Sequence, residues 1–438
     1  MMIRMLIGLA AGVVGLAQVT PAPPLTLTLK DAQMRAAGNA PQLLAAMSDS
    51  RAAHEDLVQA KGAGKPGVSA RSDYLGTQGN GTFASGRYVT NDGVHVYREW
   101  AVVHQDFNAA LLKTGVQKAS VAETIAKLKA EVARRGVAAT VTKAYYGLLA
   151  SQRKYATAQE ALDQAKRSLG ISRDLERGGE AARSDVVKAD LQVSKQDQVF
   201  REVQLAMENA RLDLAVLLFR DLDENFSIVD DLSLAPALPE FAEVQTLAGT
   251  ENPDILLANN ALRAANLDVA VAKQAYLPSL TADLAYGIEA NAFALHSTVA
   301  ADPEKGKQPN LGYFLTVSLT LPVWDWGARA SKVKQADLKR EQARVELSAT
   351  QRELIRNLRG FYSEAQTARD QVESLKRAVD LASESLRLNG LRYQAGEATI
   401  LELVDAQGAV TEARNAYNDG LVRYRLAVAN LQTLTGTF

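Results

Sequence analysis

The stretch that decides the fold reads Leu391-Arg392-Tyr393-Gln394-Ala395-Gly396-Glu397-Ala398-Thr399-Ile400-Leu401-Glu402-Leu403-Val404-Asp405-Ala406. A degenerate copy occurs earlier, and it reads Leu175-Glu176-Arg177-Gly178-Gly179-Glu180-Ala181-Ala182-Arg183-Ser184-Asp185-Val186-Val187-Lys188-Ala189. Alignment of Gly179 with Gly396 gives an offset of 217 residues. Self-similarity at one fixed spacing indicates an internal repeat. The chain is therefore predicted to be a tandem duplication.

The repeat extends far beyond these two turns. The offset of 217 also pairs Phe107 with Trp324 and Tyr145 with Tyr362, and an offset of 212 pairs Pro41 with Pro253 and Pro66 with Pro278. We therefore expect a first structural repeat at 25–235 and a second at 236–438.

Composition bounds the class of protein. The chain has 438 residues, a net charge of -1 and no cysteine. It offers no basic field for nucleic acid, and it cannot form disulfides or carry a lipid on an N-terminal cysteine. The apolar run from Met5 to Ala17 follows Arg4 and is shorter than the roughly 20 residues of a membrane span. Residues 1–17 are therefore predicted to be a secretory signal peptide.

Each repeat contains one β-hairpin, expected at about 68–107 and about 279–322. In the last strand apolar side chains alternate with small or polar ones, and the apolar set is Leu311, Tyr313, Leu315, Val317, Leu319 and Leu321. Such alternation over about ten residues is typical of a transmembrane β-strand. Taken singly, each hairpin would favour a half-buried hairpin of a soluble domain.

The remainder of each repeat is predicted to be helical. No proline occurs from Gly67 to Ala235 or from Trp324 to Phe438, so long helices can follow each hairpin, at about 110–220 and about 328–435. We also expect helix from Leu25 to about Lys61, with a break near Pro41. A heptad seam, in register in both halves, predicts coiled-coil packing; in the second half it consists of Phe361, Ala365, Ala368, Val372, Leu375, Val379, Ala382 and Leu386.

Four strands in one chain cannot close a membrane barrel, and an open sheet edge in lipid would leave backbone groups unpaired. If the strands lie in a membrane, several chains must share one barrel. Three chains would supply about twelve strands, a size that leaves a lumen.

These features resemble the TolC family of outer-membrane efflux and secretion channels. The matching segments are Leu25-Thr26-Leu27 with Asn39-Ala40-Pro41, then Leu321-Pro322-Val323-Trp324-Asp325-Trp326-Gly327, then Arg392-Tyr393-x-x-Gly396 with 401–406. The resemblance implies a mainly α-helical homotrimer with a shared twelve-stranded β-barrel in the outer membrane of a Gram-negative bacterium. It also implies an α-helical tunnel through the periplasm that contacts a periplasmic adaptor and an inner-membrane transporter.

The resemblance further assigns roles at the helix tips. It puts Ser184, Asp185 and Tyr393 at gate positions, and it puts an acidic pore constriction at Glu402 and Asp405. The arginine expected two residues after the second glycine is Ala398 here, and Arg183 is the candidate substitute. The helix turns that would face the adaptor contain Gly179, Glu180, Gly396 and Glu397.

Other classes of protein find less support in the sequence. The four histidines, His54, His95, His104 and His296, lack metal-ligand spacing, and no catalytic constellation, metal site or cofactor motif is evident. We therefore expect no enzyme. The competing interpretation is a soluble periplasmic coiled-coil adaptor or scaffold protein. Within the channel interpretation the cargo stays open between drugs, metal ions and a secreted polypeptide.

Overall fold

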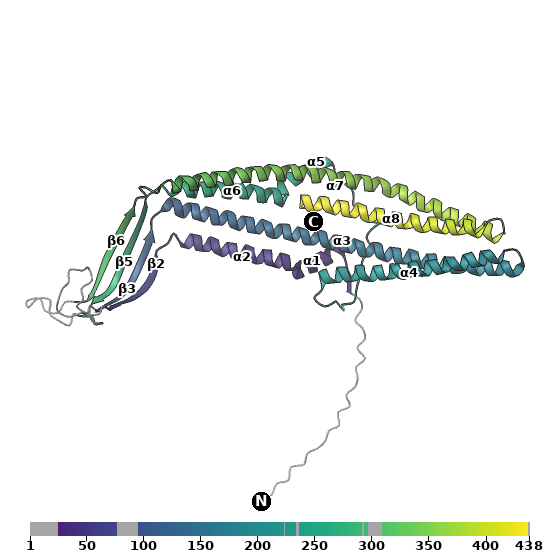
Figure 1. Cartoon of the computed structure of the whole chain (residues 1–438), viewed down its shortest axis with the longest axis horizontal. Coiled ribbons are helices and arrows are strands. Elements are labelled where there is room, and N and C mark those ends of the chain that lie inside the picture. The colour runs from purple at the N-terminus through teal and green to yellow at the C-terminus, as the bar shows by residue number, and fades with distance from the viewer. Residues whose placement is uncertain are drawn as a thin grey trace, which may run out of the picture.

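The structure of the chain, a computed structural model, describes residues 25–76, 95–222, 224–233, 236–290, 293–296 and 309–436. The predicted signal peptide at 1–17 lies outside the described residues. Figure 1 shows an elongated molecule in which a β-sheet occupies one end, long helices run along the body and two helix turns form the opposite end.

Four long helices make up the body, as the absence of proline predicts. They are α3 (Ala109–Gly178), α4 (Arg183–Leu218), α7 (Ala328–Gln394) and α8 (Ile400–Thr435). With 70 and 67 residues, α3 and α7 each extend about 100 Å at 1.5 Å per residue. In each half the long helix turns back into its shorter antiparallel partner, so α3 packs on α4 and α7 packs on α8.

The heptad seam forms these pairs. In the second half all eight seam residues are buried or half-buried, and Ala365 and Ala368 are fully buried against α8 residues such as Tyr424 and Ala427. The same holds in the first half, where Leu148, Leu162 and Leu169 are buried. Helices with this period pack as left-handed coiled coils, which the structure confirms as the organising contact of the body.

The short helices repeat as well. Helices α1 (Leu29–Asn39) and α5 (Phe241–Glu251) each have 11 residues, and α2 (Pro41–Gly62) and α6 (Pro253–Gln274) each have 22. Each longer member begins with proline at its first helical position, where the missing N–H costs no hydrogen bond. This symmetric order of elements supports the internal repeat inferred from the sequence.

The two hairpins join into one antiparallel sheet. It contains β2 (Gly67–Gly76), β3 (His95–Asp106), β5 (Ser279–Ala290) and β6 (Leu311–Thr320), in the order β2-β3-β5-β6. The central pairing of β3 with β5 connects the two repeats. Strands β2 and β6 are therefore the two edges of the sheet within the part of the chain that the structure describes.

The expectation of helix from Leu25 is wrong. Residues Leu25–Leu27 form strand β1, which pairs in parallel with β4 (Phe226–Ile228). The helix starts only after Thr28, whose side chain forms a capping box with Asp31. The strand exists because its partner lies 201 residues away in sequence, and such a pairing leaves no local periodicity. Tyr145 secures the pair by donating a hydrogen bond from Oη to the carbonyl oxygen of Val229 at 2.7 Å.

Candidate functional site

The end of the molecule opposite the sheet consists of two helix turns with the same geometry. Gly179 and Gly396 have φ angles of 79° and 71°, a conformation that glycine adopts without steric penalty. In both turns the glycine N–H bonds back three residues, and the next N–H bonds back five, from Glu180 to Leu175 and from Glu397 to Arg392. This pattern is the Schellman motif that ends a helix. The offset of 217 residues therefore also relates two identical backbone turns.

The helices that leave these turns begin differently. In α8 the N-cap is Thr399, whose hydroxyl accepts from the Glu402 N–H, while the Glu402 carboxylate accepts from the Thr399 N–H. In α4 the N-cap is Ala182, which has no side chain to accept a hydrogen bond. Because a hydroxyl N-cap stabilises a helix start by about 1 kcal/mol, the first turn of α4 is less firmly held than that of α8.

Both turns pack on one apolar core at the tip. Buried residues of the first hairpin, Leu169, Val186 and Ala189, meet Tyr393, Ile400 and Leu403 of the second. At its centre the Tyr393 hydroxyl lies 2.6 Å from the Ser172 hydroxyl, and the bond between them is buried. Nearby, Gln407 Nε2 donates to Ser168 Oγ at 2.8 Å. These two polar contacts connect the hairpins across the core.

Tyr393, predicted as a gate residue, is therefore 4% exposed and bonded within its own chain. The other two predicted gate residues lie on the first turn of α4. Ser184 is exposed, and Asp185 is half-buried with Lys188 Nζ at 3.4 Å. The sequence analysis missed Ser172 and Ser168, because a small hydroxyl residue inside a long helix gives no local signal of a distant partner.

The two predicted constriction acids differ in their surroundings. The Glu402 carboxylate takes part in the capping box and forms an ion pair with Arg392, whose Nη1 lies 3.4 Å from Glu402 Oε2. Asp405 is exposed, and its carboxylate forms no ion pair with any residue that the structure describes. Asp405 therefore carries the less compensated negative charge of the two.

The missing arginine has a structural explanation. Ala398 packs against the tip core, where a guanidinium would lose its hydration. The proposed substitute, Arg183, does not take over this position. It forms an ion pair with Glu176 of its own hairpin at 3.3 Å. The cation that reaches the start of α8 is Arg392, which also donates to the carbonyl oxygen of Glu397.

At the other end, the sheet presents apolar side chains to its surroundings. All ten residues of β6 are exposed, and the apolar set predicted from the alternation contains Tyr313 at 77%, Leu315 at 62% and Leu319 at 62% exposure. A contiguous exposed apolar surface of this kind marks an interaction site on a protein.

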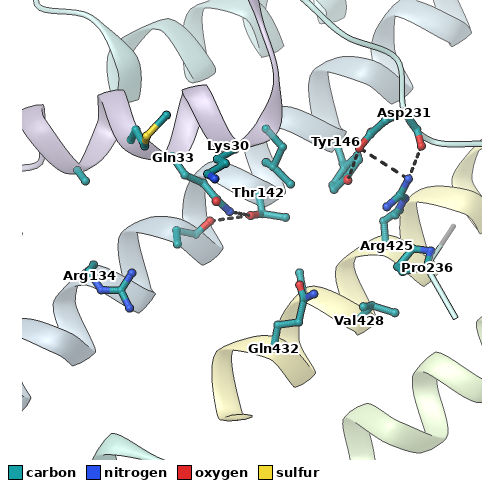
Figure 2. Close-up of a pocket in the computed structure, with 15 residues that line it drawn as sticks. Lys30, Gln33, Arg134, Thr142, Tyr146, Asp231, Pro236, Arg425, Val428 and Gln432 are labelled. Carbon is teal, nitrogen blue, oxygen red and sulfur yellow. Dashed lines mark hydrogen bonds and ion pairs between the residues drawn. The ribbon is translucent and has the colours of Figure 1, made fainter. Parts of the chain in front are cut away.

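A pocket of about 620 Å³ lies midway along the body, between α1, α3, α8 and the segment that connects β4 to α5 (Figure 2). Asp231 lies at one side of the pocket. It accepts from Tyr146 Oη at 3.3 Å and forms an ion pair with Arg425 Nη2 at 3.7 Å. These two contacts tie the connection between the repeats to α3 and α8.

The described residues contain neither a metal-binding cluster nor a membrane-spanning helix. In that part of the chain no three or more His, Cys, Asp or Glu side chains gather so as to hold a metal ion. None of the described helices has a stretch long and apolar enough to cross a membrane.

Long paired helices with an apolar-faced sheet at one end define the class of outer-membrane proteins with a helical extension. Comparison with known proteins supports this class. The sequence profile of the family "Outer membrane efflux protein" matches residues 245–437. Outer membrane protein TolC of Vibrio cholerae is 23% identical over 408 residues, which cover 91% of this chain and 88% of that protein.

Two further matches agree. Outer membrane protein OprJ of Pseudomonas aeruginosa is 24% identical over 69% of this chain, and the match covers 61% of that protein. The crystal structure of outer membrane protein VceC from Vibrio cholerae has the same fold, with a TM-score of 0.79 at 17% identity over 93% of this chain and 96% of that chain.

The chain is TolC-like: the profile of the outer membrane efflux protein family matches residues 245–437, and the similarity to TolC and the shared fold extend over nearly the whole chain. This similarity places it in the outer membrane with an extension into the periplasm, among channels and not enzymes. These findings confirm the predicted family, fold class and location, and they set aside the soluble adaptor or scaffold.

Proposed function

We propose that the chain is the passive exit duct of a tripartite efflux or type I secretion system, and that three copies form it. The observation that carries this proposal is the sheet, whose edge strands β2 and β6 have no further partner strand among the described residues, together with the exposed apolar side chains along β6. In lipid, each backbone N–H or C=O group without a hydrogen-bond partner costs several kcal/mol of free energy. The edges can be satisfied when β6 of one copy pairs with β2 of the next.

The proposed assembly follows from the number of strands. One chain contributes four strands, and three chains give a closed barrel of about twelve, which is wide enough for a lumen. Apolar side chains also remain exposed along the helices; on α4 and α7 they include Leu191, Leu205, Leu212, Leu338, Val345, Leu381 and Leu388. Several of these are seven residues apart, which suits coiled-coil contacts between neighbouring copies.

Cross-linking tests the shared barrel. The chain has no cysteine, so a pair introduced at Ser72 of β2 and at a scanned position of β6 reports only the designed contact. We expect at least one β6 position to give covalent dimers and trimers in outer membranes, with no larger species. A matched pair placed in the central strands β3 and β5 should cross-link only within one chain. Absence of any link between chains at every scanned position would contradict the proposal.

The helix tips would form the periplasmic entrance. We propose that Ser184, Asp185 and Tyr393 help to hold it closed, and that the turns with Gly179, Glu180, Gly396 and Glu397 contact a periplasmic adaptor. Support comes from the buried Tyr393–Ser172 hydrogen bond, which joins the two hairpins. An inner-membrane transporter would then supply the energy. The cargo stays open.

Ion selectivity tests the acidic constriction. In a trimer, Asp405 would supply about three carboxylates around the axis, and such rings favour cations. We expect Asp405→Asn to reduce the cation preference in planar bilayers more than Glu402→Gln does, because Arg392 already compensates Glu402. Reversal potentials under a salt gradient measure this. No shift in Asp405→Asn would remove Asp405 from the constriction, and equal shifts in both variants would contradict the compensation of Glu402 by Arg392.

A further inference from the structure

The four junctions between strands and helices lie at the same end of the sheet. In the register of the strands Gly67 pairs with His104, Asp106 pairs with Thr281 and Ser279 pairs with Thr320. All four junctions therefore lie at the end of the sheet nearest the helices, as Figure 1 shows. We define the junction collar as residues 61–66, 107–119, 270–278 and 321–336.

The collar exposes large aromatic side chains. Trp324 is 72% and Trp326 is 89% exposed, and their rings meet edge to face at 5.7 Å. Phe107, which stands at the matching position of the first repeat, is 53% exposed. Trp326 has a φ of 56°, an uncommon backbone conformation for a bulky residue. Asp325 holds it there by accepting hydrogen bonds from the backbone N–H of Gly327 at 3.1 Å and of Arg329 at 2.8 Å.

The collar is also strongly basic. It contains one acid, Asp325, against eight basic residues, which are Lys61, Lys65, Lys113, Lys118, Lys273, Arg329, Lys332 and Lys334. The whole chain has a net charge of -1, so positive charge is concentrated in this narrow zone. Among the described residues, only Lys118 and Arg329 of these eight form an ion pair.

The ion pairs of the collar show which charges remain available. Asp325 pairs with Arg329 at 3.4 Å, and Lys118 pairs with Asp268 at 2.6 Å. The lysines at 332 and 334 are exposed at the start of α7, next to the tryptophans, and form no ion pair with any described residue. An external partner with negative charge would complete this surface.

We propose that the junction collar binds anionic phospholipid headgroups of the leaflet that faces the helices. This inference rests on the proposed function, since it requires the sheet to lie in a bilayer. The collar continues directly from the exposed apolar strand β6, whose ten residues span about 33 Å when extended. In membrane proteins Trp side chains are enriched at the membrane–water interface, and lysines close to an anionic leaflet are attracted to it.

Lipid binding tests the charge component. Purified full chain is reconstituted in nanodiscs of phosphatidylcholine with phosphatidylglycerol, and lipids retained after release are counted by native mass spectrometry. We expect phosphatidylglycerol to be enriched on the wild type. Lys332→Gln with Lys334→Gln should weaken its retention about tenfold or more, because each lysine near an anionic surface contributes roughly fivefold.

A matched control is available on the same helix. Lys376 and Arg377 are exposed on α7, roughly 65 Å from Lys332 at 1.5 Å per residue. Lys376→Gln with Arg377→Gln removes the same charge and should leave lipid retention unchanged. Equal retention of the two lipids by the wild type, or equal loss in both double variants, would overturn the inference.

Fluorescence tests the aromatic component. The chain has three tryptophans, so Trp100→Phe leaves only the pair at 324 and 326. Vesicles with brominated acyl chains should quench their emission when the bromines lie near the headgroups and quench less when they lie at the chain ends. If the chain inserts into vesicles but its emission is not quenched more by bromines near the headgroups, the collar inference is wrong and the proposed function still stands. A chain that enters no vesicle of either composition would overturn the proposed function, and this inference with it.

Discussion

At the residue scale, a few side chains decide what each end of the rod can do. The glycines at 179 and 396 end α3 and α7 because they adopt a left-handed φ, and the sequence predicts that role from their position alone. The partner of Tyr393 could not be predicted, because Ser172 is 221 residues away. Local chemistry is thus visible in sequence, whereas a buried polar contact between distant helices requires coordinates.

The carboxylate of Glu131 gives a prediction on pH. Arg134 and then Arg135 bond to it and hold its pKa at about 2, below the ordinary 4.5. A lowered pKa stabilises the fold above pH 4.5, and this contribution disappears as the pH falls from 4.5 towards 2. We expect Glu131→Gln to cost about 2 kcal/mol at pH 7, a value reduced for partial exposure.

Thermal unfolding in detergent at pH 7 and at pH 3 measures this effect. The difference between wild type and Glu131→Gln should shrink at pH 3. Glu384 offers the control, because it bonds to Arg387 with the same spacing on an exposed helix face, and exposed pairs contribute little. If Glu131→Gln has wild-type stability at both pH 7 and pH 3, the bonds of Glu131 with Arg134 and Arg135 do not stabilise the fold.

At the element scale, periodicity predicts helices well and pairing poorly. The seam from Phe361 to Leu386 and the absence of proline predict α7 and its coiled-coil partner, because both signals lie within the helix itself. The strand β1 was not predicted, because its three residues depend on β4 for every ladder hydrogen bond. The capping box at Thr28 was a local signal of the true helix start, and it could have corrected the expectation.

The contact between the two hairpins yields a prediction on gating. Tyr393→Phe removes the hydroxyl that bonds to Ser172 and keeps the buried ring. Loss of one buried hydrogen bond costs about 1 kcal/mol or more, so the closed tip should loosen and conductance in planar bilayers should rise. Tyr362→Phe is the control, because this hydroxyl donates to the carbonyl oxygen of Pro239 away from the tip. Equal conductance in both variants would remove Tyr393 from the gate.

At the scale of the whole molecule, the duplication is the feature that sequence reveals most fully. Two repeats with helices of equal or nearly equal length, matching turns and one hairpin each account for the symmetric body. The division at 235 and 236, and the removal of residues 1–17, stay predictions. The tip contacts and the charge of the collar were not predicted, because each gathers residues from both repeats and becomes visible only when the repeats are folded together.

The central claim is that several copies of this chain close one barrel through the edges β2 and β6. The native mass of the protein, extracted with detergent from fractionated outer membranes, tests it most directly. A particle of three chains of 47.1 kDa each, less any cleaved leader, is the predicted result. A single chain released with the soluble periplasmic fraction would contradict the claim.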